Sequence, residues 1–469
     1  MSAPTEKPRL ELQLVTVVAR HGLRTPSKLL SSDKSSIWSC DLNKMSPPAQ
    51  ELVHFFDHFN IHRIDEDGDK TDETSKPHNH SQSLKNDVKV DQKMLLLPRG
   101  NCKGGQLTVN ARPGHLQMIR LGEKYAQRYA TYDNQFRLLD PEYDPSEVYL
   151  RSTPSKRTME SVQSVMFGMY GKANHPNFTV HVKDKKDENM YPDKSCTSLF
   201  ALRDEIKKST EFTEGEATFQ KKLLEEVKDE DVRNRINRGA WIGMENTLHS
   251  LERHRWPHPI VSQTARDTIT SASGWYAKML HGGPTTIRLG IGRFMSDVLK
   301  VMQGKVDGLR GKETEASRIR FAYFSGHDNT LIPLMNGLGI YMGHPPMGSH
   351  LEFEMYKKIH TKSVSSSDED KPPVMNNSFL DDQLKGSNKE DLWIRVLFND
   401  EERTLPKCKT KQETFNKSQF LPRPEGDEED QMTLCPWNTF HDILTKHVPA
   451  NYKEECQMKA DKMEEPFEE

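Results

Sequence analysis

Several signatures that would assign a function at once are missing from this sequence. No apolar run approaches the roughly 18–20 residues of a membrane-spanning helix, and no CxxC pair occurs among the cysteines. The G-x-S-x-G elbow, the G-x-x-x-x-G-K-[ST] loop and an arginine six positions after any cysteine are absent as well. These absences exclude a membrane span, zinc ribbons and thioredoxin chemistry, the usual hydrolase elbow, the P-loop and the cysteine-phosphatase loop.

An excess of positive charge is also lacking. Lys and Arg number 66 against 69 Asp and Glu, which gives a net charge of −3 over 469 residues. Because no basic field covers the chain, we expect neither a nucleic-acid partner nor an anionic membrane surface. The first residues, MSAPTEKPRLE, contain no apolar segment of a signal peptide.

No pattern of metal ligands stands out either. The histidines of HNH at 78–80 and HRWPH at 254–258 have no cysteine or glutamate partners at metal-binding spacing. The acidic run from Asp65 resembles a calcium loop, but Lys70 and Lys76 occupy the positions of its glycine and glutamate. We therefore expect no metal and no cofactor.

The six cysteines are even in number and far apart. Three disulfides and six reduced core thiols are both compatible with this pattern. Paired cysteines would indicate a secretory or extracellular protein, and reduced cysteines an intracellular one.

The chain alternates between strand and helix patterns at both ends. Apolar runs at 11–19, 146–153 and 318–326 indicate strands, and HLEFEMY and LWIRVLF indicate a hairpin. Residues 200–285 are helical in character, whereas 62–93 and 361–390 are polar and read as surface insertions. The sequence thus predicts an α/β fold, a mixed and mostly parallel sheet flanked by helices with an inserted helical cap. The expected units are 8–195 and 286–469 for the α/β core and 196–285 for the cap.

Cationic side chains follow three of these strands. VVARHGLRTP places Arg20, His21 and Arg24 after the first strand, and YLRSTPSKRT places Arg151 and Arg157 after the second. FAYFSGHDNT ends the third strand with His327 and Asp328. Each motif alone is more often a solvated charge or a capping turn. Carboxyl ends of parallel strands share one edge, however, so together they predict a phosphate site with histidine as the nucleophile.

These motifs resemble the histidine acid phosphatase family, branch 2 of the histidine phosphatases. RHGLRTP matches its R-H-G-x-R-x-P pattern and GHDNT its late H-D, while LRSTPSKRT and CKGGQLT are similar to its middle motifs. YPDKSC and the C-terminal LCPWNTF and NYKEEC segments look most like the lysophosphatidic acid phosphatase and 2-phosphoxylose phosphatase group. The resemblance extends from about residue 11 to 456.

The resemblance implies a role for each motif residue. His21 attacks phosphorus and becomes a phosphohistidine, and Asp328 protonates the leaving alcohol. The phosphoryl oxygens are held by Arg20, Arg24, Arg157 and His327. It also implies the disulfides Cys196–Cys456 and Cys408–Cys435, which leaves Cys40 and Cys102 as the third pair.

Two rival functions and the substrate alcohol are left open. A phosphoglycerate-mutase-like phosphotransferase is one rival, and a relative that binds phosphate without catalysis is the other. The substrate is a small phosphomonoester, and a lysophospholipid or a sugar phosphate would each fit. A lipid would need an apolar slot, for which Trp241, Ile242, Trp275 and Met279 of the cap are candidates, although these side chains could equally form the core of the cap.

Overall fold

A central sheet organises the computed structural model, and strands with parallel neighbours occupy one half of it. The strand order is β2-β4-β3-β5-β1-β6-β7-β11-β9, with β10 beside β1 and β8 beside β7. Pairing is parallel from β2 to β1 and antiparallel from β1 through β6 and β7 to β11 and β9. The predicted mixed α/β sheet is therefore confirmed, as is the hairpin of β6 and β7. The structure describes residues 9–30, 36–38, 40, 55–56, 58–64, 102, 104–108, 114–130, 137–171, 177–260, 262–359, 391–416, 419–421 and 431–457.

The strands are short except for β1 and β6. Their bounds are β1 Arg9–Arg20, β2 Phe59–Ile64, β3 Val148–Ser152, β4 Phe178–Lys183, β5 Phe321–Gly326, β6 His350–Ile359, β7 Leu392–Phe398, β8 Glu401–Glu402, β9 Glu413–Asn416, β10 Phe420–Leu421 and β11 Gln431–Pro436.

The helices lie on both faces of this sheet and beyond it. Their bounds are α3 Gly114–Tyr129, α4 Lys156–Tyr170, α5 Thr197–Lys208, α6 Thr210–Glu226, α7 Glu230–Asn237, α8 Trp241–Arg253, α9 Gln263–His281, α10 Pro284–Gly308, α11 Glu315–Arg318, α12 Asp328–Leu338, α14 Trp437–Thr445 and α15 Tyr452–Glu455, with a 3₁₀ turn at Pro406–Cys408.

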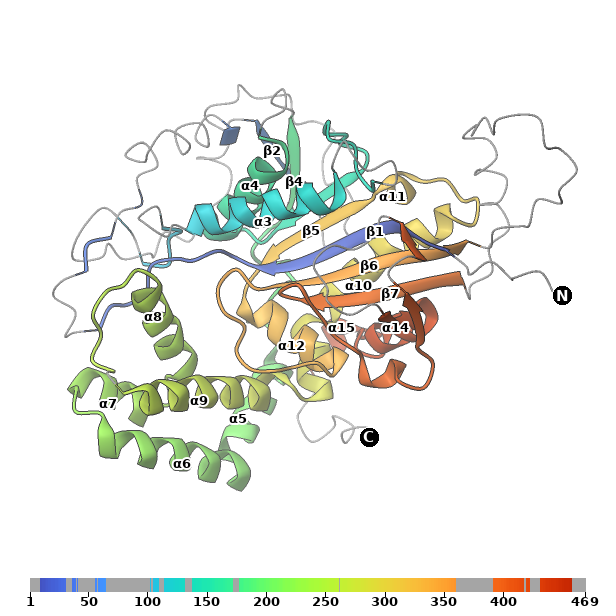
Figure 1. The fold of residues 1–469 in the computed structure, drawn as a ribbon. Coiled ribbons are helices and arrows are strands. Elements are labelled where there is room, and N and C mark those ends of the chain that lie inside the picture. The colour runs from blue at the N-terminus through green and yellow to red at the C-terminus, as the bar shows by residue number, and fades with distance from the viewer. Residues whose placement is uncertain are drawn as a thin grey trace, which may run out of the picture.

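The apolar run in β1 is explained by burial on both faces of the sheet. Val15 and Val17 belong to the core under α3 and α4, whereas Leu14 and Val18 belong to the core under α10, α12 and α14. Figure 1 shows these two helical layers on opposite sides of the sheet. A strand covered on both faces reads as a continuous apolar run, which is why the sequence identified it.

Helices α5 to α9 gather beyond one end of the sheet (Figure 1). Their core contains Leu248, Ile269 and Trp241, and it also takes in Trp38 and Cys102 from the N-terminal part of the chain. The core of the predicted cap, formed here by α5 to α9, is therefore completed by residues from the N-terminal part of the chain.

The structure describes only a small part of the predicted surface insertions. Residues 62–64 belong to β2 and are not loop, which corrects the expected start of the first insertion. The rest of 62–93 and all of 361–390 lie outside the described residues.

No described helix combines the length and apolar character that a bilayer span requires.

Candidate active site

The six predicted site residues meet at the carboxyl edge of the parallel strands. Arg20, the last residue of β1, is in register with Gly326, the last residue of β5. His21 and His327 directly follow these two residues and therefore lie next to each other at the same edge of the sheet. Their ring centroids lie 5.6 Å apart. Arg157 is the second residue of α4, which follows β3, and Asp328 is the first residue of α12. Two helix N-termini thus lie beside the histidines, a setting that favours a bound anion.

The glycine of the R-H-G motif is required by the packing of α3. A β-carbon at Gly22 would lie 2.7 Å from the carbonyl oxygen of Gly114 and 2.8 Å from Cγ of Met118. A β-carbon at Gly114 would lie 1.9 Å from the carbonyl oxygen of Leu23. The first turn of α3 can therefore approach the chain after β1 only because both positions lack a side chain.

His21 is held as a neutral imidazole. Its Nδ1 lies 2.9 Å from the carbonyl oxygen of Gly22, which can only accept, so Nδ1 carries the proton and Nε2 is left with its lone pair. Burial, with further contributions from Arg157, Arg20 and Arg24, places the pKa of His21 well below its usual value. An unprotonated Nε2 is the form of histidine that can attack phosphorus.

Arg20 and Arg24 differ in their partners. Arg20 donates to the carbonyl oxygen of Pro345 at 2.5 Å and to Oδ1 of Asn246 at 2.6 Å, and its Nη2 lies 3.0 Å from Oδ2 of Asp328. Although the sequence shows no carboxylate beside this arginine pair, the fold brings Asp328 to Arg20.

Arg24 is buried but forms no ion pair within the described chain; it donates to the carbonyl oxygen of Thr25 and to Oγ of Ser27. Burial, reinforced by Arg157 and Arg20, lowers the pKa of Arg24 to about 9. A buried guanidinium without a carboxylate is costly unless an anion joins it.

His327 forms hydrogen bonds through both ring nitrogens. Nη2 of Arg157 lies 3.2 Å from its Nδ1, and since arginine only donates, Nδ1 is the acceptor. Nε2 then donates to Oγ1 of Thr153 at 2.9 Å. Burial and the charge of Arg157 place the pKa of His327 well below its usual value, so this ring is also neutral.

The Asp328 carboxylate accepts several hydrogen bonds. The backbone N–H of Asn329 donates to Oδ1 at 2.9 Å, while Nδ2 of Asn246 lies 3.3 Å and Nε2 of His344 lies 3.2 Å from Oδ2. Burial alone would raise the pKa of Asp328, but Arg20 and then His344 outweigh it and keep that pKa well below its usual value. The carboxyl group is therefore ionised before a substrate arrives.

Sequence patterns did not indicate three of these neighbours. Asn246 comes from α8, His344 from the loop between α12 and β6, and Thr153 from the turn before α4. Asn246 and His344 stand in no motif, whereas Thr153 lies within LRSTPSKRT but was not singled out as a site residue. The contact between Asn246 and Arg20 spans 226 positions.

Arg151, the first arginine of the middle motif, has a different partner set. Its guanidinium lies 2.5 Å from Asp297 and 3.0 Å from Glu188, and it also donates to Asn189 at 2.6 Å. This network joins the end of β3 to α10 and does not include the residues around His21.

The two tryptophans considered for a lipid slot pack against other aromatic side chains of the cap. Trp241 is buried against Phe219 and donates to Glu216, and Trp275 packs against Phe212 and Phe219. Of the two alternatives left open, the core of the cap therefore holds for Trp241, which is fully buried, whereas Trp275 is half-buried.

One group of side chains in the described chain has metal-ligand composition. His350, Glu352 and Asp400 place one ligand atom each within 4.8 Å of one another. Arg128 already pairs with both carboxylates and Lys124 with Asp400. These cations compete with a metal ion for the same oxygens.

Comparisons with known proteins agree on one family. A probable acid phosphatase of Dictyostelium discoideum is 27% identical over 390 residues, covering 77% of this chain and 73% of that protein. Lysophosphatidic acid phosphatase type 6 of Homo sapiens is 26% identical over 371 residues, covering 76% and 77%. The Klebsiella phytase structure matches with a TM-score of 0.51 at 13% identity over 97% of this chain and 100% of that one, which shows a shared fold. The profile of the histidine phosphatase superfamily (branch 2) matches residues 11–277, more than half of the sequence, and the chain belongs to this family.

Proposed function

We propose that this protein, a histidine acid phosphatase by family, hydrolyses small phosphomonoesters through a phosphohistidine on His21, with Asp328 as the general acid. One observation carries the proposal. A neutral imidazole with a free Nε2 stands among buried arginines, and one of them, Arg24, has no carboxylate partner in the described chain. A phosphate dianion supplies the missing negative charge.

The reaction has two steps. Nε2 of His21 attacks phosphorus, the bond from phosphorus to the leaving oxygen breaks, and protonated Asp328 gives its proton to that oxygen. A water molecule then attacks the phosphohistidine, the Asp328 carboxylate takes one of its protons, and inorganic phosphate leaves. The imidazole is neutral again at the end. Positioning and charge neutralisation supply most of the rate in phosphoryl transfer.

The phosphoryl oxygens are assigned to Arg20, Arg24, Arg157 and His327. Because Nε2–H of His327 donates to Thr153 and Nδ1 accepts from Arg157, one of these contacts must open before His327 can donate to a phosphoryl oxygen. The proposal involves no metal or cofactor.

The experiment is a panel of phosphomonoesters, assayed at acidic and neutral pH by release of inorganic phosphate. The panel contains a lysophospholipid, a sugar phosphate, glycerol phosphate and p-nitrophenyl phosphate. We expect turnover by the wild type, and a loss of at least about a thousand-fold in kcat for His21→Ala, since the nucleophile is removed. The matched control is His441→Ala, which changes a partly exposed histidine on α14.

A short incubation with labelled substrate should leave acid-labile phosphate on the wild type and none on His21→Ala. Near wild-type turnover by His21→Ala would disprove the nucleophile. Absence of turnover by the wild type on the whole panel would disprove the function.

A further inference from the structure

The general acid Asp328 is hydrogen-bonded by a second titratable side chain. Nε2 of His344 lies 3.2 Å from Oδ2, the same oxygen that Arg20 and Asn246 contact. Only 2% of the His344 side chain is exposed, compared with 19% of the Asp328 side chain. The imidazole is therefore more deeply buried than the carboxylate that it contacts.

This contact bears on how Asp328 obtains a proton. The low pKa of Asp328 leaves its carboxyl group ionised, yet the proposed reaction needs it protonated when the alcohol leaves. Arg20 cannot supply that proton because a guanidinium does not deprotonate in proteins, and the Asn246 amide does not titrate. Among the described side chains that contact this carboxylate, only His344 belongs to a residue type that gains and loses a proton near neutral pH.

We propose that His344 is a positioning residue that stores the proton used by Asp328; this inference rests on the proposed function. In the resting enzyme the imidazolium of His344 donates Nε2–H to the Asp328 carboxylate. Substrate binding brings negative charge that offsets Arg20, and the proton moves from Nε2 to the carboxylate. Asp328 passes it to the leaving oxygen, and His344 becomes neutral. In the second step Asp328 takes a proton from water and returns it to His344.

The surroundings of His344 single it out among neighbouring histidines. The charged and titratable groups that interact with His344 or with Asp328 come from several elements. They are Arg20, His21 and Arg24 at or just after the end of β1, His249 of α8, His281 of α9, His327 before α12 and Tyr341 of the loop that carries His344. Burial lowers the pKa of both His249 and His281 to about 3, so these two rings stay neutral.

His281 is further fixed by Arg203. Nη2 of Arg203 donates to Nδ1 of His281 at 2.9 Å, and no hydrogen bond joins His281 to Asp328. In the described chain, His344 is the histidine that touches the general acid.

The loop that carries His344 is also fixed in place. The hydroxyl of Tyr341 donates to the carbonyl oxygen of Gly274 at 2.9 Å, and the carbonyl oxygen of Pro345 accepts from Arg20. Contacts on both sides of His344 therefore tie it to the cap helix α9 and to β1. A fixed donor is what a proton store next to the acid requires.

The test compares His344→Gln with the wild type on glycerol phosphate and p-nitrophenyl phosphate between pH 4 and 8. Glutamine keeps an N–H donor near Asp328 but cannot store a proton. We expect kcat for glycerol phosphate to fall about 10- to 100-fold, because general acid assistance as a whole contributes about 10²–10⁴. We expect p-nitrophenyl phosphate to change less than about three-fold, since its leaving group needs little protonation. The pH profile for glycerol phosphate should change shape.

His249→Gln, which alters a neighbouring ring without a hydrogen bond to Asp328, is the matched control and should keep the wild-type ratio between the two substrates.

A wild-type rate and pH profile for His344→Gln on both substrates would show that the N–H donor alone suffices and would overturn the proposal. Nitrogen NMR of the wild type, with histidine labelled, gives a second readout that does not depend on the activity of a variant. The proposal requires that both ring nitrogens of His344 carry a proton in the resting enzyme, and a ring with one bare nitrogen at the pH of the assay contradicts it. If the wild type turns over neither ester, the proposed function itself fails; if it does and only the His344 results differ, this inference alone fails.

Discussion

Arg151 and Arg157 lie six positions apart in one motif but have different environments. Arg151 is enclosed by Asp297, Glu188 and Asn189, so its charge is neutralised within the protein. Arg157 is the second residue of α4 and contacts His327. A sequence motif shows that two cations are close, but it does not show that the fold encloses one of them, Arg151, with two carboxylates.

Asp328→Asn tests the role of the general acid at the level of one residue. The amide keeps the shape of the side chain but has no proton to donate. We expect kcat for glycerol phosphate to fall about 10²–10⁴-fold and kcat for p-nitrophenyl phosphate to fall far less. Steady-state kinetics on both esters measures the difference.

Asp297→Asn is the matched control for this variant. It alters a carboxylate that pairs with Arg151, so it should lower the melting temperature and leave the ratio between the two esters unchanged. Equal losses on both esters in Asp328→Asn would mean that Asp328 only supports the structure.

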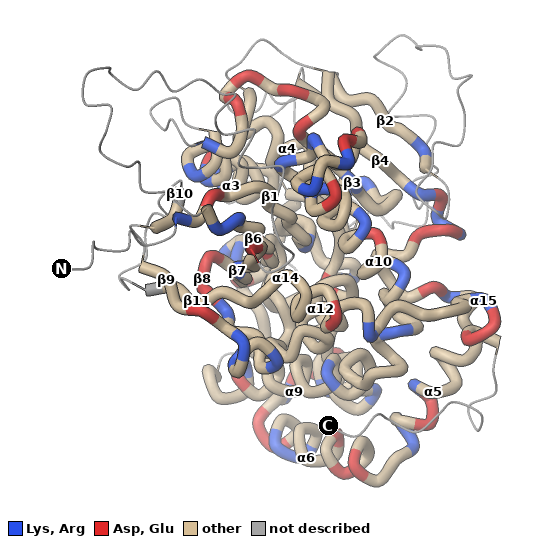
Figure 2. The backbone as a smooth tube through the Cα atoms, turned by 90° about the vertical axis from the view of Figure 1, so that its right-hand side faces the viewer, with Lys and Arg blue, Asp and Glu red and all other residues tan. Residues whose placement is uncertain are grey.

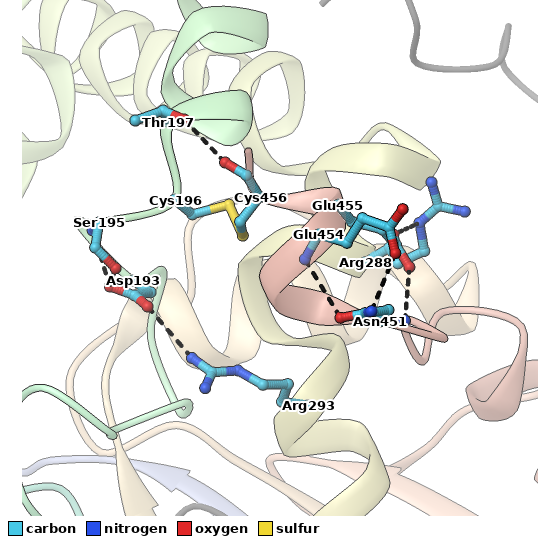
Figure 3. Close-up of a disulfide and its surroundings, with 10 residues drawn as sticks. All are labelled: Asp193, Ser195, Cys196, Thr197, Arg288, Arg293, Asn451, Glu454, Glu455 and Cys456. Atoms are coloured by element: carbon cyan, nitrogen blue, oxygen red, sulfur yellow. Dashed lines mark hydrogen bonds and ion pairs between the residues drawn. A yellow bond between two sulfur atoms is a disulfide. The ribbon is translucent and has the colours of Figure 1, made fainter. Parts of the chain in front are cut away.

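At the level of elements, a disulfide joins the start of the cap to the C-terminal end of the described chain. Cys196 immediately precedes α5 and Cys456 follows α15, and their Cα atoms lie 4.6 Å apart. Oγ1 of Thr197 donates to the carbonyl oxygen of Cys456 at 2.9 Å, a contact drawn beside the disulfide in Figure 3. Arg293 of α10 reaches Asp193 at 3.5 Å. The loop before α5, helix α10 and the turn at Cys456 are thereby held together.

Both disulfides that the family resemblance implied, Cys196–Cys456 and Cys408–Cys435, are present, and so is the remaining pair, Cys40–Cys102. Their loops differ greatly in length, with a sequence separation of 260 for Cys196–Cys456 and 27 for Cys408–Cys435. Closing a longer loop removes more entropy from the unfolded chain. The loop-length relation gives a difference of about 2 kcal/mol between these two crosslinks.

We therefore expect the double variant C196S/C456S to lose about 2 kcal/mol more stability than C408S/C435S. Urea unfolding under non-reducing conditions measures both free energies of unfolding, with the wild type as the reference. A larger loss for C408S/C435S would show that local packing, and not loop entropy, determines the contribution of each crosslink.

At the scale of the whole molecule, local patterns predicted the elements better than the contacts between them. The strand before His21 and the strand before His327 were predictable because each is an apolar run that ends in polar residues. Strand β4 was not predicted although its sequence alternates, and the last three residues of β2 were assigned to an insertion. The contacts of Asn246 and His344 with Asp328 were not predictable, since they depend on how the cap and a loop pack against the sheet.

The distribution of charge also separates what the sequence predicts from what only the fold creates. Figure 2 shows basic and acidic residues interspersed along the described chain, in agreement with the net charge of −3. The positive character of the site is therefore local and arises from the meeting of three strand ends. Composition alone could exclude a basic surface but could not reveal this concentration of cations.

The whole molecule should become less stable as the pH falls below about 6.5. Six buried or half-buried histidines have strongly lowered pKa values, mainly because burial disfavours the charged ring. Their unfolded counterparts take up a proton near pH 6.5, whereas the folded forms stay neutral, so the unfolded state binds more protons in this range. Stability then rises with pH up to about 6.5 and falls below it, by about 1.4 kcal/mol per pH unit for each fully shifted histidine. These histidines are His21, His327, His115, His249, His281 and His447.

Thermal unfolding between pH 7 and pH 4.5 measures this loss, with and without inorganic phosphate. Phosphate should raise the melting temperature because it adds negative charge beside Arg24 and its neighbours; at 100 times its dissociation constant a ligand adds about 2.7 kcal/mol. His441, which is partly exposed on α14, provides the control: His441→Gln should not change the pH dependence. Stability that stays constant from pH 7 to pH 5 would mean that the buried histidines accept protons in the folded state. The neutral form of His21, on which the proposed attack depends, would then not persist at acidic pH.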